Sequence, residues 1–137
     1  MKDQYFGDRR DYFKLNLLLD LFDGTQLQQL VSVLMLTKPD TTAEGRLTAF
    51  PVGAGRPVMH TFLTNAVAEK RRRVSGLRHL MASLGVPYVP HHDDRFFEHD
   101  QRLEYFSELK RVASDAALVF YDPDIGIEIK NTATWRF

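Results

Sequence analysis

The chain has 137 residues, a formal net charge of zero and no cysteine. The zero charge excludes a global field that attracts nucleic acid or an anionic membrane, so any such attraction needs a local patch. Without cysteine there is no disulfide framework and no thiolate chemistry, and zinc could bind only through histidine and carboxylate ligands.

The length and composition are those of one globular domain spanning residues 1–137. Hydrophobic residues make up 44% of the chain and charged residues 26%, which excludes intrinsic disorder and a collagen-like structure. Met1 leads into the polar tripeptide KDQ, and no apolar run approaches the roughly 20 residues that span a bilayer. We therefore expect a cytoplasmic protein with no membrane contact.

The first half of the chain predicts a helix, a strand and a long loop. Residues 12–22, YFKLNLLLDLF, are apolar on nearly every side and predict a helix buried between layers, with Asp11 as its N-cap and a stop at the following Asp-Gly pair. Residues 30–37, LVSVLMLT, predict a strand covered on both faces. Residues 41–57 are rich in glycine and proline and predict a loop.

The second half predicts helices alternating with strands. Apolar residues at helical spacing predict one helix from 62 to 84, capped by Thr61 and ended by Gly85. A strand, a helix and a strand follow over residues 86–90, 101–114 and 117–121. This alternation predicts an α/β, Rossmann-like three-layer domain with a short, mostly parallel sheet.

Acidic residues follow each of the three predicted strands. They are Asp40, Asp93, Asp94, Asp122 and Asp124. In open parallel sheets, ligands bind outside the carboxyl ends of the strands. If the three strands are parallel neighbours, these carboxylates reach the same edge of the sheet, so the sequence predicts an acidic site there.

The segment DPDIGIE, residues 122–128, carries the densest group of carboxylates. Strand alternation puts Asp122, Asp124 and Glu128 on one side, where they repel one another unless a cation lies among them. Such oxygen ligands suit Mg²⁺ or Mn²⁺, with Lys130 placed to stabilise developing charge. The alternative is a turn in which the two aspartates cap the backbone and Glu128 pairs with Lys130 in solvent.

Two motifs of phosphoester enzymes resemble this segment. The PD…ExK motif of metal-dependent nucleases resembles it at Pro123, Asp124, Glu128 and Lys130. The aspartate pair of haloacid-dehalogenase-like phosphatases, which follows an apolar strand, resembles Asp122 and Asp124. Both resemblances imply that the carboxylates hold a metal ion.

The stretch VFYDPD, residues 119–124, resembles the DPPY motif of amino-methylating class I methyltransferases. The resemblance implies that Asp122 accepts a hydrogen bond from the target amino group, while Pro123 shapes the backbone around it. Asp124 stands where the second proline is expected, and no G-x-G follows the first predicted strand to cradle S-adenosylmethionine. S-adenosylmethionine is therefore the less favoured cofactor.

Two longer motifs, QYFGDRRDYFKLNLL at residues 4–18 and FYDPDIGIEIK at residues 120–130, resemble a little-characterised bacterial and phage family. That family is distantly similar to three-Cys-motif partner proteins of methyltransferase-like fold. Its members are longer, so the resemblance implies a truncated or minimal version whose sheet lacks strands.

The N-terminal motif places Asp8, Asp11 and Lys14 about one helical turn apart. In one interpretation the aspartates cap a helix, and Asp11 pairs with Lys14 at i, i+3 spacing. In the other, these side chains pack across the strand ends and bind substrate.

Two further clusters have alternative interpretations. The run EKRRR, residues 69–73, offers Arg71 and Arg72 to phosphate groups, or lies over the core as solvated cations. HHDD, residues 91–94, offers metal ligands or forms an ordinary polar loop. Adjacent histidines on extended backbone point to opposite faces, so at most one is expected to join an aspartate in a single site.

Two classes of function follow. The first is an enzyme acting on nucleic acid or a nucleotide, by metal-dependent phosphoester chemistry or by methyl transfer. Its catalytic residues would be Asp122, Asp124, Glu128 and Lys130, its metal ligands Asp122, Asp124 and Glu128, and its substrate-binding residues Asp8, Asp11, Lys14, Arg71 and Arg72. The second is a non-catalytic interaction module, phage- or defence-associated, on a degenerate Rossmann-like scaffold that dimerises through a sheet edge.

Overall fold

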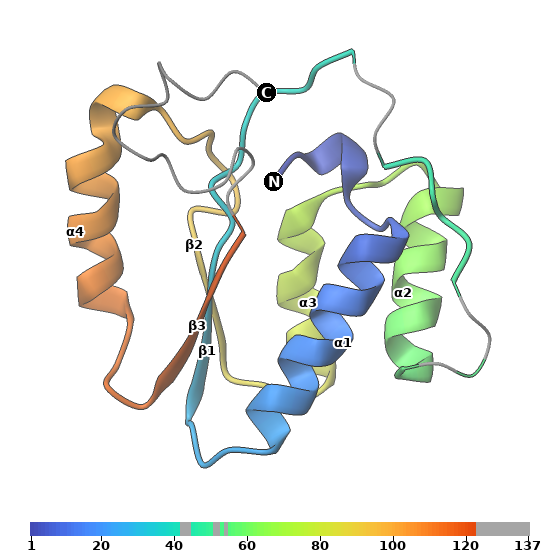
Figure 1. Cartoon of the computed structure of the whole chain (residues 1–137), viewed down its shortest axis with the longest axis horizontal. Coiled ribbons are helices and arrows are strands. Elements are labelled where there is room, and N and C mark those ends of the chain that lie inside the picture. The colour runs from blue at the N-terminus through green and yellow to red at the C-terminus, as the bar shows by residue number, and fades with distance from the viewer. Residues whose placement is uncertain (42–44, 51–52, 54, 123–137) are drawn as a thin grey trace, which may run out of the picture.

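The computed structural model describes residues 1–41, 45–50, 53 and 55–122 as a small parallel sheet with helices on both faces (Figure 1). In chain order the elements are α1 (Arg9–Asp23), β1 (Gln29–Val33), α2 (Pro57–Ala68), α3 (Leu77–Ser83), β2 (Tyr88–His91), α4 (Arg102–Val112) and β3 (Ala117–Tyr121). Short 3₁₀ turns occur at Asp3–Tyr5, Val74–Gly76 and His99–Gln101. Within the described part of the chain, no helix has the length and apolarity needed to cross a membrane.

The sheet has the order β2-β1-β3, and β1 pairs in parallel with both neighbours. The register places Val31 opposite Val89 on one side and opposite Val119 on the other. Figure 1 shows α1, α2 and α3 on one face of the sheet and α4 on the other. The predicted α/β class and the parallel pairing of the three strands are therefore confirmed.

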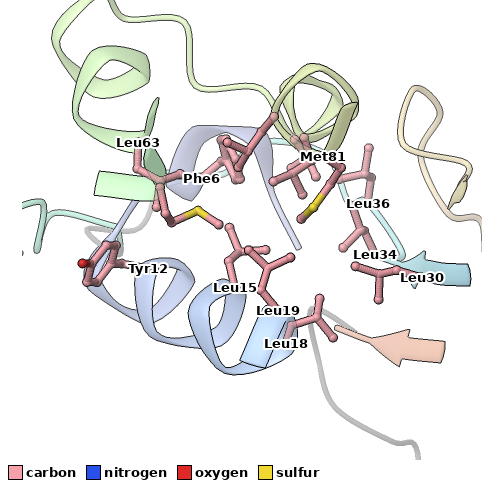
Figure 2. Packing of buried hydrophobic residues seen from close by; sticks show 14 residues of the cluster. Phe6, Tyr12, Leu15, Leu18, Leu19, Leu30, Leu34, Leu36, Leu63 and Met81 are labelled. Carbon is pink, nitrogen blue, oxygen red and sulfur yellow. The ribbon is translucent and has the colours of Figure 1, made fainter. Parts of the chain in front are cut away.

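Strand alternation divides the apolar residues between two cores. Leu30 and Leu34 pack against the helices of the first face, and Figure 2 shows Leu15, Leu18 and Leu19 of α1 turned toward them. Val31 and Val33 pack in the second cluster, which contains Tyr105 and Leu109 of α4. Fully burying one such side chain contributes about 1.5–3 kcal/mol, so the two clusters fix both faces of the sheet.

Helix α1 differs from the prediction at its start and on its outer face. Its N-cap is Asp8 rather than Asp11: Asp8 has extended backbone, and its Oδ1 accepts hydrogen bonds from the amides of Arg10 and Asp11 at 2.8 and 2.9 Å. Phe13 and Leu17 are exposed, so α1 is a surface helix with one buried face. Its apolar composition alone did not reveal this difference between faces.

The single helix predicted from 62 to 84 is wrong, because the structure has two helices there. Thr61 lies inside α2, which begins at Pro57, where the fixed φ of proline suits the first helical position. Lys70 has a φ of 54°, a left-handed conformation that ends the helical path after Ala68. The EKRRR run therefore lies in the break between α2 and α3 and not on a helix face.

β1 and β2 also differ from their predicted bounds, whereas β3 has the bounds predicted. β1 stops at Val33, and Met35 has a φ of 43°, which is incompatible with extended backbone. β2 begins only after Pro87 and includes Pro90, which an outer strand tolerates because one side of its backbone needs no partner.

Candidate functional site

Three charged side chains meet beside the carboxyl ends of β1 and β3. Lys14 Nζ lies 2.6 Å from Asp122 Oδ2 and 3.0 Å from Asp11 Oδ1. Lys14 and Asp11 come from the first turns of α1, whereas Asp122 directly follows β3. We call these three residues the strand-end triad.

Local backbone contacts position each member of the triad. The amide of Asp122 donates to the carbonyl of Val33 at 3.0 Å, which continues the β1–β3 pairing by one residue. Asp11 Oδ2 accepts from the amide of Gly7 at 2.9 Å, so the carboxylate is held at the helix entry. One Asp11 oxygen thus supports the turn while the other binds Lys14.

Both α1 members of the triad have shifted pKa values. Burial raises the pKa of Asp11, although the neighbouring Lys14 ammonium opposes the shift. Burial alone would lower the pKa of Lys14, but the Asp11 and Asp122 carboxylates outweigh it and raise that pKa. Lys14 is therefore held firmly as a cation, and Asp11 is a carboxylate that has lost much of its solvation by water.

Lys14 borders two cavities, one of about 500 Å³ lined also by Arg10 and Phe13 and one that is much smaller. A cavity of about 10 Å³, room for roughly one water molecule, is lined by Lys14, Asp11, Met1, Ser32 and Tyr88 among others. The N-terminal ammonium of Met1 donates to the carbonyls of Leu34 at 3.0 Å and Asp122 at 3.3 Å. The first residue of the chain therefore covers the end of β1, a contact for which the sequence offers no periodic signal.

The other acidic strand ends have partners of their own. Asp40 is 3.3 Å from Lys2 Nζ and accepts a hydrogen bond from the Tyr5 hydroxyl. The carboxylate of Asp93 is fully buried and accepts two hydrogen bonds from Arg78, at 2.7 and 2.5 Å. The three strands end at one edge of the sheet, but their aspartates bind different basic residues.

The two arginines predicted to bind substrate have different partners in the structure. Arg72 donates to the carbonyl oxygens of Phe6, Gln4 and Gly45 at 2.7–2.8 Å, which ties the N-terminal segment to the break between α2 and α3. Arg71 is exposed and pairs with Glu69. Arg72 has a structural role in this arrangement, whereas Arg71 faces solvent.

Asp8 has the capping role that one interpretation of the N-terminal motif gave it, and Lys14 with Asp11 forms the predicted i, i+3 pair. The Lys14–Asp122 contact also brings α1 to the strand ends, as the other interpretation required. Three predicted residues, Asp124, Glu128 and Lys130, lie outside the described residues.

The prediction that His91 and His92 point to opposite faces is wrong. His92 has a φ of 54°, and the ring centroids of the two histidines are 4.2 Å apart. The left-handed conformation turns the His92 side chain back beside its neighbour. Glu108 of α4 joins them through a 2.5 Å contact with His92 Nε2, a neighbour that sequence spacing did not reveal.

No family model, curated protein or solved structure matches this chain. Functional inference therefore depends on the geometry of the described residues.

Proposed function

We propose that this chain is a Rossmann-like domain that acts on nucleic acid or a nucleotide by metal-dependent phosphoester chemistry. The strand order β2-β1-β3 supports the fold, since doubly wound sheets of the flavodoxin type begin in this order. The connection from β1 to β2 runs through α2 and α3 on one face, and that from β2 to β3 runs through α4 on the other (Figure 1). In such sheets, ligands bind at the carboxyl ends of β1 and β3.

The observation that carries the proposal is the pair of carboxylates converging on Lys14 at that point. Asp11 and Asp122 oxygens lie 3.0 and 2.6 Å from one nitrogen, so they are close enough to share a cation. Oxygen donors of this kind fit a hard ion such as Mg²⁺ or Mn²⁺. In our proposal Asp122 holds the ion together with Asp124 and Glu128, the carboxylates that follow it in sequence.

The remaining groups have roles that follow from their charge. A bound divalent ion would polarise a phosphoryl oxygen as a Lewis acid. Lys14, and in our proposal Lys130, hold positive charge where a phosphate group gains negative charge in the transition state. Asp8 supports this arrangement indirectly because it fixes the first turn of α1, from which Asp11 and Lys14 project.

Phosphoester chemistry fits the described residues better than methyl transfer does. The resemblance to class I methyltransferases implies a glycine-rich loop after β1 that cradles S-adenosylmethionine. Met1 occupies that position: its ammonium binds the Leu34 carbonyl at 3.0 Å, and its own carbonyl accepts from the amide of Thr37 at 3.0 Å.

A non-catalytic interaction module is the second candidate, because α1 presents an apolar stripe to solvent. Phe13, Leu17 and Leu21 follow one another at i, i+4 spacing and are all exposed. β2 and β3 are the outer strands of the described sheet, so pairing with a second copy through a strand edge is the corresponding mode of assembly. In this alternative the triad serves stability alone.

Calorimetric titration of the full chain with Mn²⁺ and with S-adenosylmethionine separates these candidates. Phosphoester chemistry predicts Mn²⁺ binding that weakens at least about tenfold in Asp122→Asn, because one charged ligand is lost. Asp20→Asn, at the other end of α1 in an ion pair with Arg56, is the matched control and should bind as the wild type does. Binding of S-adenosylmethionine without Mn²⁺ would favour methyl transfer, and silence with both would leave the interaction module.

A further inference from the structure

A second group of potential metal ligands lies at the carboxyl end of β2, under α4. His91, His92 and Glu108 each offer one ligand atom, and these atoms all lie within 4.8 Å of one another. His91 is the last residue of β2 and is buried, while His92 and Glu108 are partly exposed. The group involves no member of the strand-end triad.

His91 is oriented as metal-binding histidines usually are. Its Nε2 lies 2.8 Å from the carbonyl oxygen of Tyr105, and a carbonyl only accepts, so this nitrogen carries the proton. In the neutral ring, Nδ1 then keeps a free lone pair. A histidine that binds a metal through one nitrogen commonly donates its other N–H to a backbone carbonyl, which fixes the ring.

His92 and Glu108 share one cationic partner, Arg95, whose guanidinium lies 2.9 Å from Glu108 Oε2. His92 Nε2 lies 2.5 Å from Glu108 Oε2 and 2.7 Å from an Arg95 nitrogen. If Nε2 carries a proton it faces the Arg95 donor unfavourably, and if it carries a lone pair it faces the Glu108 carboxylate unfavourably. A metal ion in the place of the Arg95 guanidinium would take one lone pair from His92 Nε2 and another from the Glu108 carboxylate.

The backbone conformation of His92 also holds the two imidazole rings close together. His92 adopts a φ of 54°, which is unfavourable for a residue with a side chain, and this conformation brings its ring beside that of His91. Strained backbone of this kind persists only where the surrounding structure holds it. Tyr105 supplies part of that support, because its ring packs 4.4 Å from the His91 ring and 5.2 Å from the His92 ring, centroid to centroid.

We propose that His91, His92 and Glu108 bind a divalent transition metal ion, with Zn²⁺ the best fit. Two imidazoles and one carboxylate are a ligand set that zinc prefers, and they leave a fourth tetrahedral position for water or a substrate oxygen. Ligand atoms of a tetrahedral zinc lie about 3.3 Å apart, since each bond is about 2.0–2.2 Å long. Small rotations of the partly exposed His92 and Glu108 side chains close the remaining gap, and Arg95, half exposed, moves aside.

This proposal does not depend on the proposed function. The carboxylates beside Asp122 suit a hard ion with oxygen ligands, whereas this group suits a metal that accepts imidazole nitrogen. Substitution of Asp122 should therefore leave metal binding by the two histidines and Glu108 unchanged.

The test is a titration of the untagged full chain with Co²⁺, followed by its visible absorption, and then displacement with Zn²⁺. The wild type should bind one equivalent of Co²⁺ in a tetrahedral environment. His92→Ala and Glu108→Gln should each weaken binding at least about tenfold, the smallest loss usual for altering such a site. His79→Ala, which removes an exposed histidine on α3, is the matched control and should bind as the wild type does.

The Arg95→Ala variant distinguishes metal binding by the two histidines and Glu108 from a purely structural role of these residues. It removes the competing guanidinium, so it should tighten Co²⁺ binding severalfold. Circular dichroism before and after chelation checks that each variant is folded, and if one ligand variant unfolds, the other decides. The proposal is wrong if the wild type binds neither ion, or if the folded ligand variants bind as tightly as His79→Ala.

Discussion

Lys14 Nζ lies 2.6 Å from Asp122 Oδ2, although the two residues are 108 positions apart in the sequence. The contact joins the first turns of α1 to the residue after β3, the two segments that the strand order brings to the same edge of the sheet. Asp11 shares the same ammonium at 3.0 Å. One lysine therefore neutralises two carboxylates that approach from different elements.

Removing that ammonium should destabilise the fold. The Lys14 and Asp122 side chains are 32% and 19% exposed, so Lys14→Met should lower the free energy of unfolding by about 2 kcal/mol, between the values for surface and buried pairs. Urea denaturation measures this. Lys38→Met is the control, because its pair with Glu98 is 70% and 48% exposed and should contribute no more than about 0.5 kcal/mol. Equal effects of the two substitutions would contradict a structural role for the triad.

The Arg72 guanidinium should matter for stability and Arg71 should not. Arg72 donates to three carbonyls from the N-terminal segment and from Gly45, so Arg72→Met should cost about 2–3 kcal/mol through unsatisfied acceptors. Arg71→Met should change stability by less than about 0.5 kcal/mol, because its pair with Glu69 is exposed. Thermal unfolding of both variants checks the difference, and a similar loss in both would refute the assigned role of Arg72.

If the basic run at residues 69–73 contacts phosphate groups, Arg71 should contribute to the salt dependence of oligonucleotide binding. The logarithm of oligonucleotide affinity should fall less steeply with the logarithm of salt in Arg71→Met, by about one unit of slope for one lost phosphate contact. Fluorescence anisotropy across salt concentrations measures the slope. An unchanged slope would mean that Arg71 is a solvated surface cation, the alternative that its exposure also allows.

Two glycines with left-handed backbone should respond differently to alanine. A Cβ at Gly45 would lie 2.7 Å from the Tyr5 Cα, whereas a Cβ at Gly85 would meet nothing within 4 Å. Both positions have a φ of 70°, so each substitution pays the backbone strain of about 1 kcal/mol. Gly45→Ala should add the clash and exceed about 2 kcal/mol in total. Equal losses by chemical denaturation would show that the N-terminal turn does not pack on Gly45 as described.

Stability should fall at alkaline pH. Burial raises the pKa of Tyr88 and of Tyr105 from 10.0 to about 12. In that range the unfolded chain releases these protons while the folded chain keeps them, so stability falls by up to about 1.4 kcal/mol per pH unit for each group. The raised pKa of Lys14 likewise makes the protein less stable as the pH rises, because the unfolded chain loses this proton first. Urea midpoints between about pH 9.5 and 11.5 measure the slope, which should be shallower in Tyr88→Phe. A flat profile would contradict burial of these hydroxyls.

The fold class was predictable because its signals are local and periodic. Apolar runs near β1 and β3, together with the helical spacing of Phe106 and Leu109 in α4, indicate the elements and their alternation, although Leu103 on the same predicted face is 86% exposed. The ends of β1, α2 and β2 were harder to predict. Met35, Lys70 and His92, which follow these elements, adopt left-handed backbone although none of them is glycine. The sequence gives no rule for such positions, because tertiary contacts stabilise them.

The candidate site was predictable only in part. The acidic segment starting at Asp122 and the motif containing Asp11 and Lys14 were identified separately, and their contact follows from the parallel strand order. The pairing of Asp93 with Arg78 and of His92 with Glu108 depends on how α3 and α4 pack on the sheet. Periodicity indicates which face of a helix is buried, but not which residue of another element it meets.

The most direct test of the central proposal is cleavage of a phosphodiester substrate by the full chain in the presence of Mg²⁺ or Mn²⁺. Single- and double-stranded oligonucleotides and a chromogenic phosphodiester cover the proposed substrate class. The proposal predicts cleavage that chelation abolishes, that Asp122→Asn lowers at least about a hundredfold through loss of a metal ligand, and that Asp20→Asn leaves intact. Turnover that is absent with every substrate and both ions, or unaffected by Asp122→Asn, would contradict it.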